Sequence, residues 1–259
     1  MSTPTRNRFR AAAMAVAPVA LLAAFLYQPY LPGAAPGPET IAQAVEADPT
    51  RWAVAQLLTV GAFALFVLAF QALRGRLRDA GEERWSSFAF PLVVVGGVVV
   101  AAVIGMQVTF AGAARTGADT AAPARATDPF LSVVVIAAVA FLVGILTFAR
   151  GIAHSRIMGR SMTTLVVIAA VVMGLALAAP IFHVIFYVAG IAAIVTFWPL
   201  AWATVRTGSA TEGGVEPTAE ADRDPQRRAV HPNATAHTSG HGRRAKSGVR
   251  SGRRPTPTM

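Results

Sequence analysis

Six apolar runs, each about 20 residues long, restrict the fold of this sequence more than any other feature. In each run, Val, Ala, Leu, Ile and Phe occupy every side of a helix, without the alternation of a half-buried strand. A helix that is apolar all round must be buried in protein or in lipid. The sequence therefore predicts an all-α polytopic transmembrane helix bundle of about six helices. The predicted spans are residues 11–28, 52–73, 87–111, 130–149, 162–179 and 182–205.

The last two spans depend on one corner. Residues 161–205 contain no charged residue, and a single helix of this length would be about 70 Å long, more than twice the hydrocarbon core. We therefore expect the chain to turn back at Ala179-Pro180. One helix followed by a re-entrant segment is the alternative.

The first outer loop, residues 29–50, holds four prolines that exclude a continuous helix. Within it, Thr40 to Ala47 predicts a short surface helix that ends before Asp48-Pro49.

Arginine placement predicts the orientation, because cytoplasmic loops of membrane proteins carry an excess of Lys and Arg. If the N-terminus is cytoplasmic, the outer loops hold only Arg51, Arg115 and Arg125. The inner segments then hold Arg6, Arg8, Arg10, Arg74, Arg76, Arg78, Arg84, Arg150, Arg156 and Arg160. Both termini are predicted to lie on the cytoplasmic side of the cell membrane. This placement explains the net charge of +10 without a nucleic-acid partner.

The first span has a second interpretation, as a cleaved signal peptide. It follows a basic segment, and Gly33-Ala34-Ala35 offers small residues for cleavage. The other spans keep their orientation in either case.

Two predicted hairpins share spacings that suggest an internal duplication. Arg74-Gly75 and Arg150-Gly151 are 76 residues apart, and Asp48-Pro49 and Asp128-Pro129 are 80 apart. Parallel repeats occur in transporters. The alternative is that Arg-Gly pairs are common at inner helix ends in this composition.

Residues 207–259 are predicted to form a disordered cytoplasmic tail, because they hold almost no large apolar residue. A basic cluster near its end predicts contact with anionic lipid headgroups, since each basic residue near such a membrane is worth about 1 kcal/mol. A solvated tail is the alternative. The cluster comprises Arg243, Arg244, Lys246, Arg250, Arg253 and Arg254.

The predicted spans hold no Lys, Arg, Asp or Glu, and the chain holds no cysteine. These absences count against carboxylate-coupled carriers, voltage sensors and thiolate chemistry. No catalytic residue, metal site or cofactor is predicted.

Four polar residues near the outer helix ends are the candidates for a site: Gln56, Gln107, His183 and Tyr187. His183 and Tyr187 are four residues apart and share a helix face. They would converge on a pocket in the outer leaflet. Hydrogen bonding between helices is the plainer alternative.

Small and aromatic residues add predictions about packing. Gly97, Ala101 and Gly105 form a ridge that suits close helix packing, within the bundle or in a dimer. Trp52, Trp85, Trp198 and Trp202 lie near predicted span ends, where indole rings favour the headgroup region.

The pattern Ala47-Asp48-Pro49-x-x-Trp52, followed by an apolar span that ends Ala72-Leu73-Arg74, resembles small multi-pass integral membrane proteins of high-GC bacteria. The resemblance covers about residues 10–206 and implies a membrane location, but no substrate and no catalytic residue. We expect a non-enzymatic structural, regulatory or accessory protein that associates with other membrane helices. A small transporter or permease for a neutral or lipid-like solute is the alternative.

Overall fold

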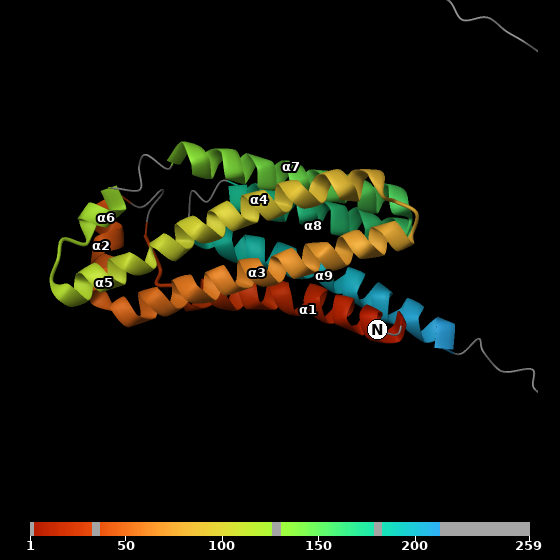
Figure 1. Ribbon diagram of the computed structural model, residues 1–259, viewed down its shortest axis with the longest axis horizontal. Helices are drawn as coiled ribbons and strands as arrows, with labels where there is room; N and C mark the ends of the chain where they lie inside the picture. Colours follow the sequence, from red (N-terminus) through yellow and green to blue (C-terminus); the bar gives the residue numbers. More distant parts are fainter. Residues whose placement is uncertain (1–2, 33–36, 126–130, 179–182, 213–259) are drawn as a thin grey trace, which may run out of the picture. The chain divides into compact units, whose positions relative to one another are not determined.

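The computed structural model describes residues 3–32, 37–125, 131–178 and 183–212, and every regular element in these ranges is a helix (Figure 1). The first five are α1 (Thr3–Tyr27), α2 (Pro38–Ala47), α3 (Pro49–Asp79), α4 (Arg84–Met106) and α5 (Val108–Thr116). They are followed by α6 (Ala121–Arg125), α7 (Leu131–Ser155), α8 (Arg160–Ala178) and α9 (His183–Glu212). The predicted all-α fold and the short surface helix α2 are confirmed.

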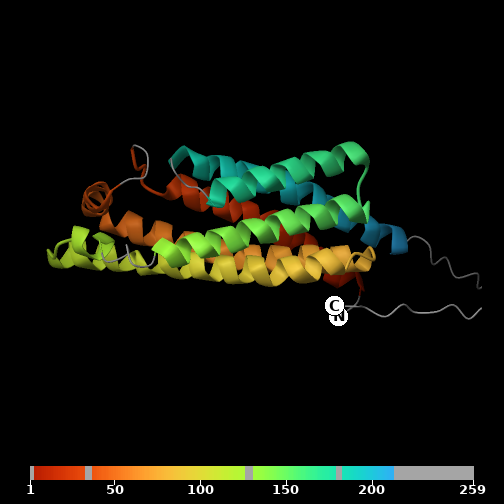
Figure 2. The same cartoon turned by 90° about the horizontal axis from the view of Figure 1, so that it is seen from above.

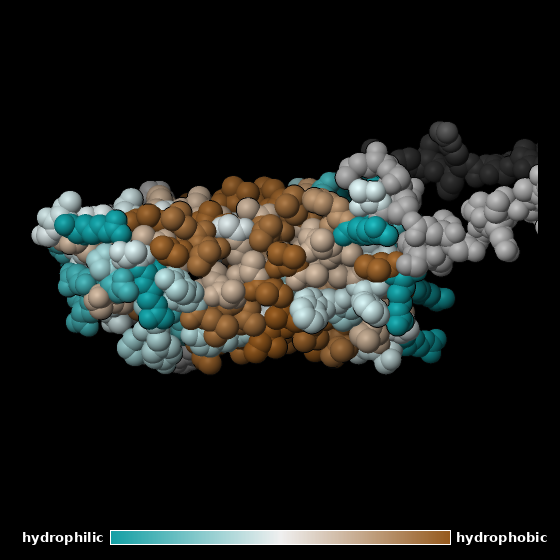
Figure 3. Space-filling view, turned by 90° about the horizontal axis from the view of Figure 1, so that it is seen from below, coloured by the Kyte–Doolittle hydropathy of each residue, from teal (hydrophilic) through white to brown (hydrophobic). Residues whose placement is uncertain are grey.

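Six helical stretches in the described ranges are long and apolar enough to cross a membrane, as predicted. They are Thr5–Tyr27, Pro49–Asp79, Arg84–Thr116, Ser132–Ser155, Arg160–Ala178 and His183–Arg206. Figure 3 shows the consequence on one face of the bundle, where an apolar belt separates two hydrophilic ends. The chain is built as a multi-pass membrane protein.

The long uncharged stretch forms two helices that pack against each other. Helix α8 ends at Ala178 and α9 begins at His183, in accord with the predicted corner. Pro180 itself and the predicted tail from residue 213 onward, including its basic cluster, lie outside the described residues.

Several helices continue past the apolar runs that predicted them. Helix α3 reaches Asp79, because a helix does not have to end where it leaves lipid, and Arg76 and Arg78 favour its C-terminal dipole. The third span turns at Gln107 and continues as α5 until Gly117, whose φ of 70° ends the helix. Helix α9 runs on to Glu212, so residues 207–212 of the predicted disordered tail are helical, because a helix can continue past the apolar run that predicts it.

The helices form a bundle in which α1 packs between α3 and α9, α4 packs against α3 and α7, and α8 packs between α7 and α9 (Figure 2). Phe70 of α3 lies at the centre of the core. Its ring centroid is 5.2–6.2 Å from those of Phe66, Phe141, Phe148 and Phe197. The predicted hairpins correspond to α3–α4 and α7–α8, but Asp128-Pro129 lies outside the described residues, so duplication stays a prediction.

Two glycines bring α4 and α7 into close contact. A Cβ added to Gly96 would lie 2.6 Å from the carbonyl oxygen of Ala137 and 2.7 Å from Cβ of Phe141. A Cβ added to Gly144 would lie 2.6 Å from Cγ2 of Val93 and 3.1 Å from the carbonyl oxygen of Ala89. Glycine is therefore required on both sides of this contact, which we call the glycine contact.

The predicted ridge of small residues lies beside this contact. A Cβ on Gly97 would meet Phe141 at 3.6 Å and Phe63 at 3.9 Å, and one on Gly105 would meet Val60 at 3.8 Å. The ridge therefore packs within the bundle, mainly toward α3, and Gly96, which lies outside it, makes the closer approach.

At one end of the bundle, α2, α5 and α6 form a cap over the start of α3. Its small core contains Leu31, Val45, Trp52 and Phe110. The indole Nε1 of Trp52 donates a hydrogen bond to the carbonyl oxygen of Gln107 at 3.0 Å. The cap encloses Trp52, whose exposed fraction is 1%, so the ring contacts protein on all sides, and its headgroup position stays a prediction.

The start of α1 and the end of α9 lie together at the other end, beside the α3–α4 and α7–α8 connections (Figure 1). We call this the arginine-rich end. Here the Trp85 ring lies under two guanidinium groups, with Cζ of Arg150 and Arg84 at 4.6 and 5.6 Å from its centroid. The Glu82 carboxylate accepts hydrogen bonds from the backbone amides of Trp85 and Ser86.

Candidate functional site

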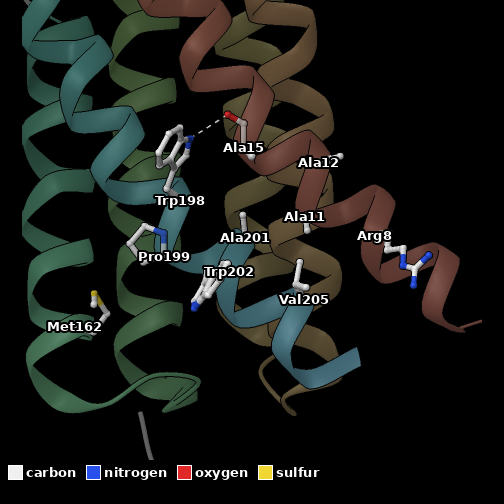
Figure 4. A pocket seen from close by; sticks show the side chains of 10 residues that line it. All are labelled: Arg8, Ala11, Ala12, Ala15, Met162, Trp198, Pro199, Ala201, Trp202 and Val205. Atoms are coloured by element: carbon white, nitrogen blue, oxygen red, sulfur yellow. Dashed lines mark hydrogen bonds between the residues drawn. The ribbon is translucent and has the colours of Figure 1, made fainter. Parts of the chain in front are cut away.

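A groove of about 670 Å³ opens on the outside of the bundle between α1 and α9, near the arginine-rich end (Figure 4). Because two tryptophans wall it, we call it the tryptophan groove. Its lining residues are Arg8, Ala11, Ala12, Ala15, Met162, Trp198, Pro199, Ala201, Trp202 and Val205. Both helices and the start of α8 therefore contribute to it.

The tryptophans form the wall on α9. Although 52% and 62% exposed, Trp198 and Trp202 are both held in place by neighbouring groups. The indole Nε1 of Trp198 donates a hydrogen bond to the carbonyl oxygen of Ala15 at 3.2 Å, which ties this ring to α1. Cζ of Arg206 lies 5.1 Å from the Trp202 ring centroid, within the range of a cation–π interaction.

The floor of the groove is made of small side chains. Ala11 and Ala15 lie four residues apart and face the same side of α1, as i and i+4 positions do. Ala201 adds a third methyl group from α9. Ala11 and Ala201 are each 6% exposed and belong to the core of the bundle, so these two small residues serve the close approach of α1 to α9.

The chemistry of the groove is that of an apolar binding surface. Arg8 contributes the one charged side chain among the described residues that line it. This lining has no carboxylate, histidine or hydroxyl group that could transfer a proton or attack a substrate. The geometry suits binding of an apolar surface with its polar end beside Arg8.

The four polar residues predicted to form an outer site fall into two groups. His183 and Tyr187 lie together on α9, with ring centroids 5.5 Å apart in an edge-to-face arrangement. Tyr30 and Phe186 also place their rings against His183, at 5.3 and 5.7 Å. His183 is 5% exposed, and neither ring nitrogen has a hydrogen-bond partner within the described part of the chain.

The two glutamines lie near Trp52, on α3 and at the α4–α5 turn. Gln107 acts through its backbone carbonyl, which accepts the Trp52 hydrogen bond. Gln56 follows Trp52 by one helical turn and is 1% exposed, and its Nε2 has no partner among the described atoms. The contacts thus join His183 with Tyr187, and Gln107 with Trp52. A single site formed by all four residues stays a prediction.

Sequence reasoning identified the tryptophans of the groove but not its floor. Two signals were present: Ala11 and Ala15 have the spacing of a close helix contact, and Trp198 and Trp202 have the same spacing on the last span. The pairing of the first span with the last was the missing information.

Comparisons with known proteins add no relative: no protein family, curated protein or solved structure matches this chain.

Proposed function

We propose that this chain is a non-enzymatic accessory protein of the cell membrane, which binds a transmembrane helix of a partner protein in the tryptophan groove. The observation that carries the proposal is an apolar groove on the outside of a bundle whose central helices are closely packed. Both features suit a protein that acts through its outer surface.

A helix is favoured as the occupant by the residues that line the groove. On the outer side of the groove Ala12 is exposed and Ala15 is half-buried. Small side chains at a helix surface let a second helix approach, and association in lipid depends on such packing. Trp202 stands beside this floor with most of its side chain exposed, and tryptophan is enriched among residues that dominate binding energy. Arg8 at the end of the groove favours an acidic residue just outside the membrane on the partner helix.

Transport of a neutral or lipid-like solute has less support. A transport pathway between the hairpins α3–α4 and α7–α8 would have to pass mainly between α4 and α7, because these two helices make most of the contact between the hairpins. The glycine contact brings backbone atoms of the two helices together at this interface.

We place the arginine-rich end, and with it both termini, on the cytoplasmic side. The support is the arginine distribution: within the described residues, eleven arginines lie at this end, and three, Arg51, Arg115 and Arg125, lie at the capped end. This is the asymmetry expected of cytoplasmic loops.

Photocrosslinking from the groove tests the proposed function. The chain has no cysteine, so an Ala12→Cys variant carries one benzophenone-maleimide probe in the groove. Leu146→Cys on α7, a side chain 40% exposed near the same end of the bundle, is the matched control. We expect Ala12→Cys, but not Leu146→Cys, to form a discrete protein adduct in native membranes, mapped by mass spectrometry to a transmembrane segment of the captured protein.

The adduct must also depend on the groove itself. Trp202→Ala removes the exposed wall without touching the probe site, and we expect it to reduce the adduct at least several-fold. Equal adducts from both probe positions, adducts with lipid only, or an adduct that survives Trp202→Ala would each refute helix docking.

A further inference from the structure

A second hollow, of about 310 Å³, lies between α1 and α3 at the arginine-rich end. Four arginines line it: Arg6 and Arg10 from α1, and Arg74 and Arg78 from α3. At 100° per residue, Arg6 and Arg10 lie on the face of α1 opposite the one that carries Arg8 and Ala15. We call this the basic hollow, and it is separate from the tryptophan groove.

The charge of the basic hollow is strongly unbalanced. Asp79 is the one carboxylate in its lining, and it is paired with Arg10. Arg6 and Arg78 have no acidic partner within the described ranges, and the Arg74 guanidinium lies over the Phe90 ring at 5.2 Å. Three positive charges are therefore left for a ligand. Like charges held together in this way favour an anion.

Gly75 makes this arrangement possible. A Cβ at this position would lie 2.3 Å from Nη2 and 2.7 Å from Cζ of Arg10. The glycine thus gives the Arg10 side chain room to lie against α3, where it reaches Asp79. Because Arg10 neutralises this carboxylate, the other three guanidinium groups do not face a competing negative charge.

The lining also has an apolar side. Phe9 and Leu68 border the basic hollow, and both side chains are substantially exposed. At the depth where a helix leaves lipid, arginine side chains meet phosphate groups and apolar side chains meet acyl chains. A free inorganic anion would need only the first kind of contact.

We propose that the basic hollow binds the phosphate headgroup of an acidic phospholipid, with an acyl chain along Phe9 and Leu68. Guanidinium groups suit this role because their donors match the geometry of phosphate oxygens. The site does not depend on the proposed helix docking, since it lies on the other face of α1.

The test measures lipid retained by the full-length protein after reconstitution in phosphatidylcholine with a minor fraction of phosphatidylglycerol. We expect native mass spectrometry to show bound phosphatidylglycerol on the wild type, and Arg74→Gln with Arg78→Gln to reduce it about fivefold for each arginine removed. Arg156→Gln with Arg160→Gln removes two exposed charges at the same end and serves as the matched control. We expect it to retain the lipid.

A second pair of variants leaves the charge unchanged. Gly75→Ala should displace Arg10 and weaken phosphatidylglycerol binding several-fold, whereas Gly61→Ala, on the same helix with nothing within 4 Å of an added Cβ, should not. The proposal is overturned if Arg156→Gln with Arg160→Gln lowers retention as much as Arg74→Gln with Arg78→Gln, because binding would then follow net charge alone. It is also overturned if inorganic phosphate displaces the lipid, since a free anion would then be the ligand.

Discussion

The glycine contact and the tryptophan groove use small residues in opposite ways. Between α4 and α7, Gly96 and Gly144 are covered by the neighbouring helix, so that backbone meets backbone. Between α1 and α9, Ala12 remains exposed and Ala15 half-buried, and two exposed tryptophans stand beside them. The difference teaches that small residues in a membrane helix indicate that another helix can approach closely. They do not indicate whether that helix belongs to the same chain or to another protein. Three substitutions test the comparison by stability.

The largest effect is expected at the glycine contact. Gly96→Leu would force a side chain into the Ala137 carbonyl and Phe141, which cannot both move aside. We expect a loss of about 3 kcal/mol or more in the free energy of unfolding, at the upper end of overpacking effects, measured as unfolding of the purified protein in mixed micelles. Gly61→Leu faces open space and should change stability little. Equal losses of unfolding free energy from Gly96→Leu and Gly61→Leu would show that the close contact of α4 with α7 does not depend on glycine at position 96.

A smaller effect is expected at the wall of the tryptophan groove. Trp198→Phe keeps an aromatic ring but removes the hydrogen bond to the Ala15 carbonyl. We expect a loss of about 1 kcal/mol, the usual worth of one hydrogen bond, by the same measurement. Trp202→Phe, whose indole is held through its ring by Arg206, should lose less. A larger loss of unfolding free energy from Trp202→Phe than from Trp198→Phe would mean that the Trp198 hydrogen bond does not stabilise this side of the groove.

The smallest effect is expected at Ala12, on the outer side of the groove. Ala12→Leu adds a large side chain that projects from the bundle, since Ala12 is exposed. We expect the free energy of unfolding to change by less than about 0.5 kcal/mol. A loss comparable to that of Gly96→Leu would show that the groove is filled by the chain itself, and the contrast between the two helix pairs would disappear.

The helical architecture could be predicted from the sequence because lipid imposes one requirement on every span. Twenty apolar residues without a charge have few structures open to them in lipid other than a helix. The division of the last uncharged stretch into α8 and α9 agrees with its length, which exceeds one span. Helix ends were less predictable. The end of an apolar run indicates where a helix leaves lipid. The helix itself ends where its hydrogen bonding is interrupted or where a capping residue such as Gly117 follows it.

The candidate sites were less accessible to sequence reasoning because they depend on which helices become neighbours. Arg8 and Trp202 are 194 positions apart, and no periodicity within either span indicates that α1 packs against α9. Trp52 shows the same limit. Its place near a span end suggested the headgroup region, but the cap that buries it is built from three short segments with weak individual patterns.

The turn at Gln107 has a consequence for how the chain sits in a bilayer. Arg84 to Thr116 is a stretch of 33 residues, about 50 Å at 1.5 Å per residue, against a hydrocarbon core of about 30 Å. The surplus of about 20 Å includes α5, which packs in the cap through Phe110. A thicker bilayer could cover more of Arg84–Thr116 and still meet apolar side chains. The length of Arg84–Thr116 therefore allows the protein to tolerate a bilayer that is thicker than average, that is, hydrophobic mismatch.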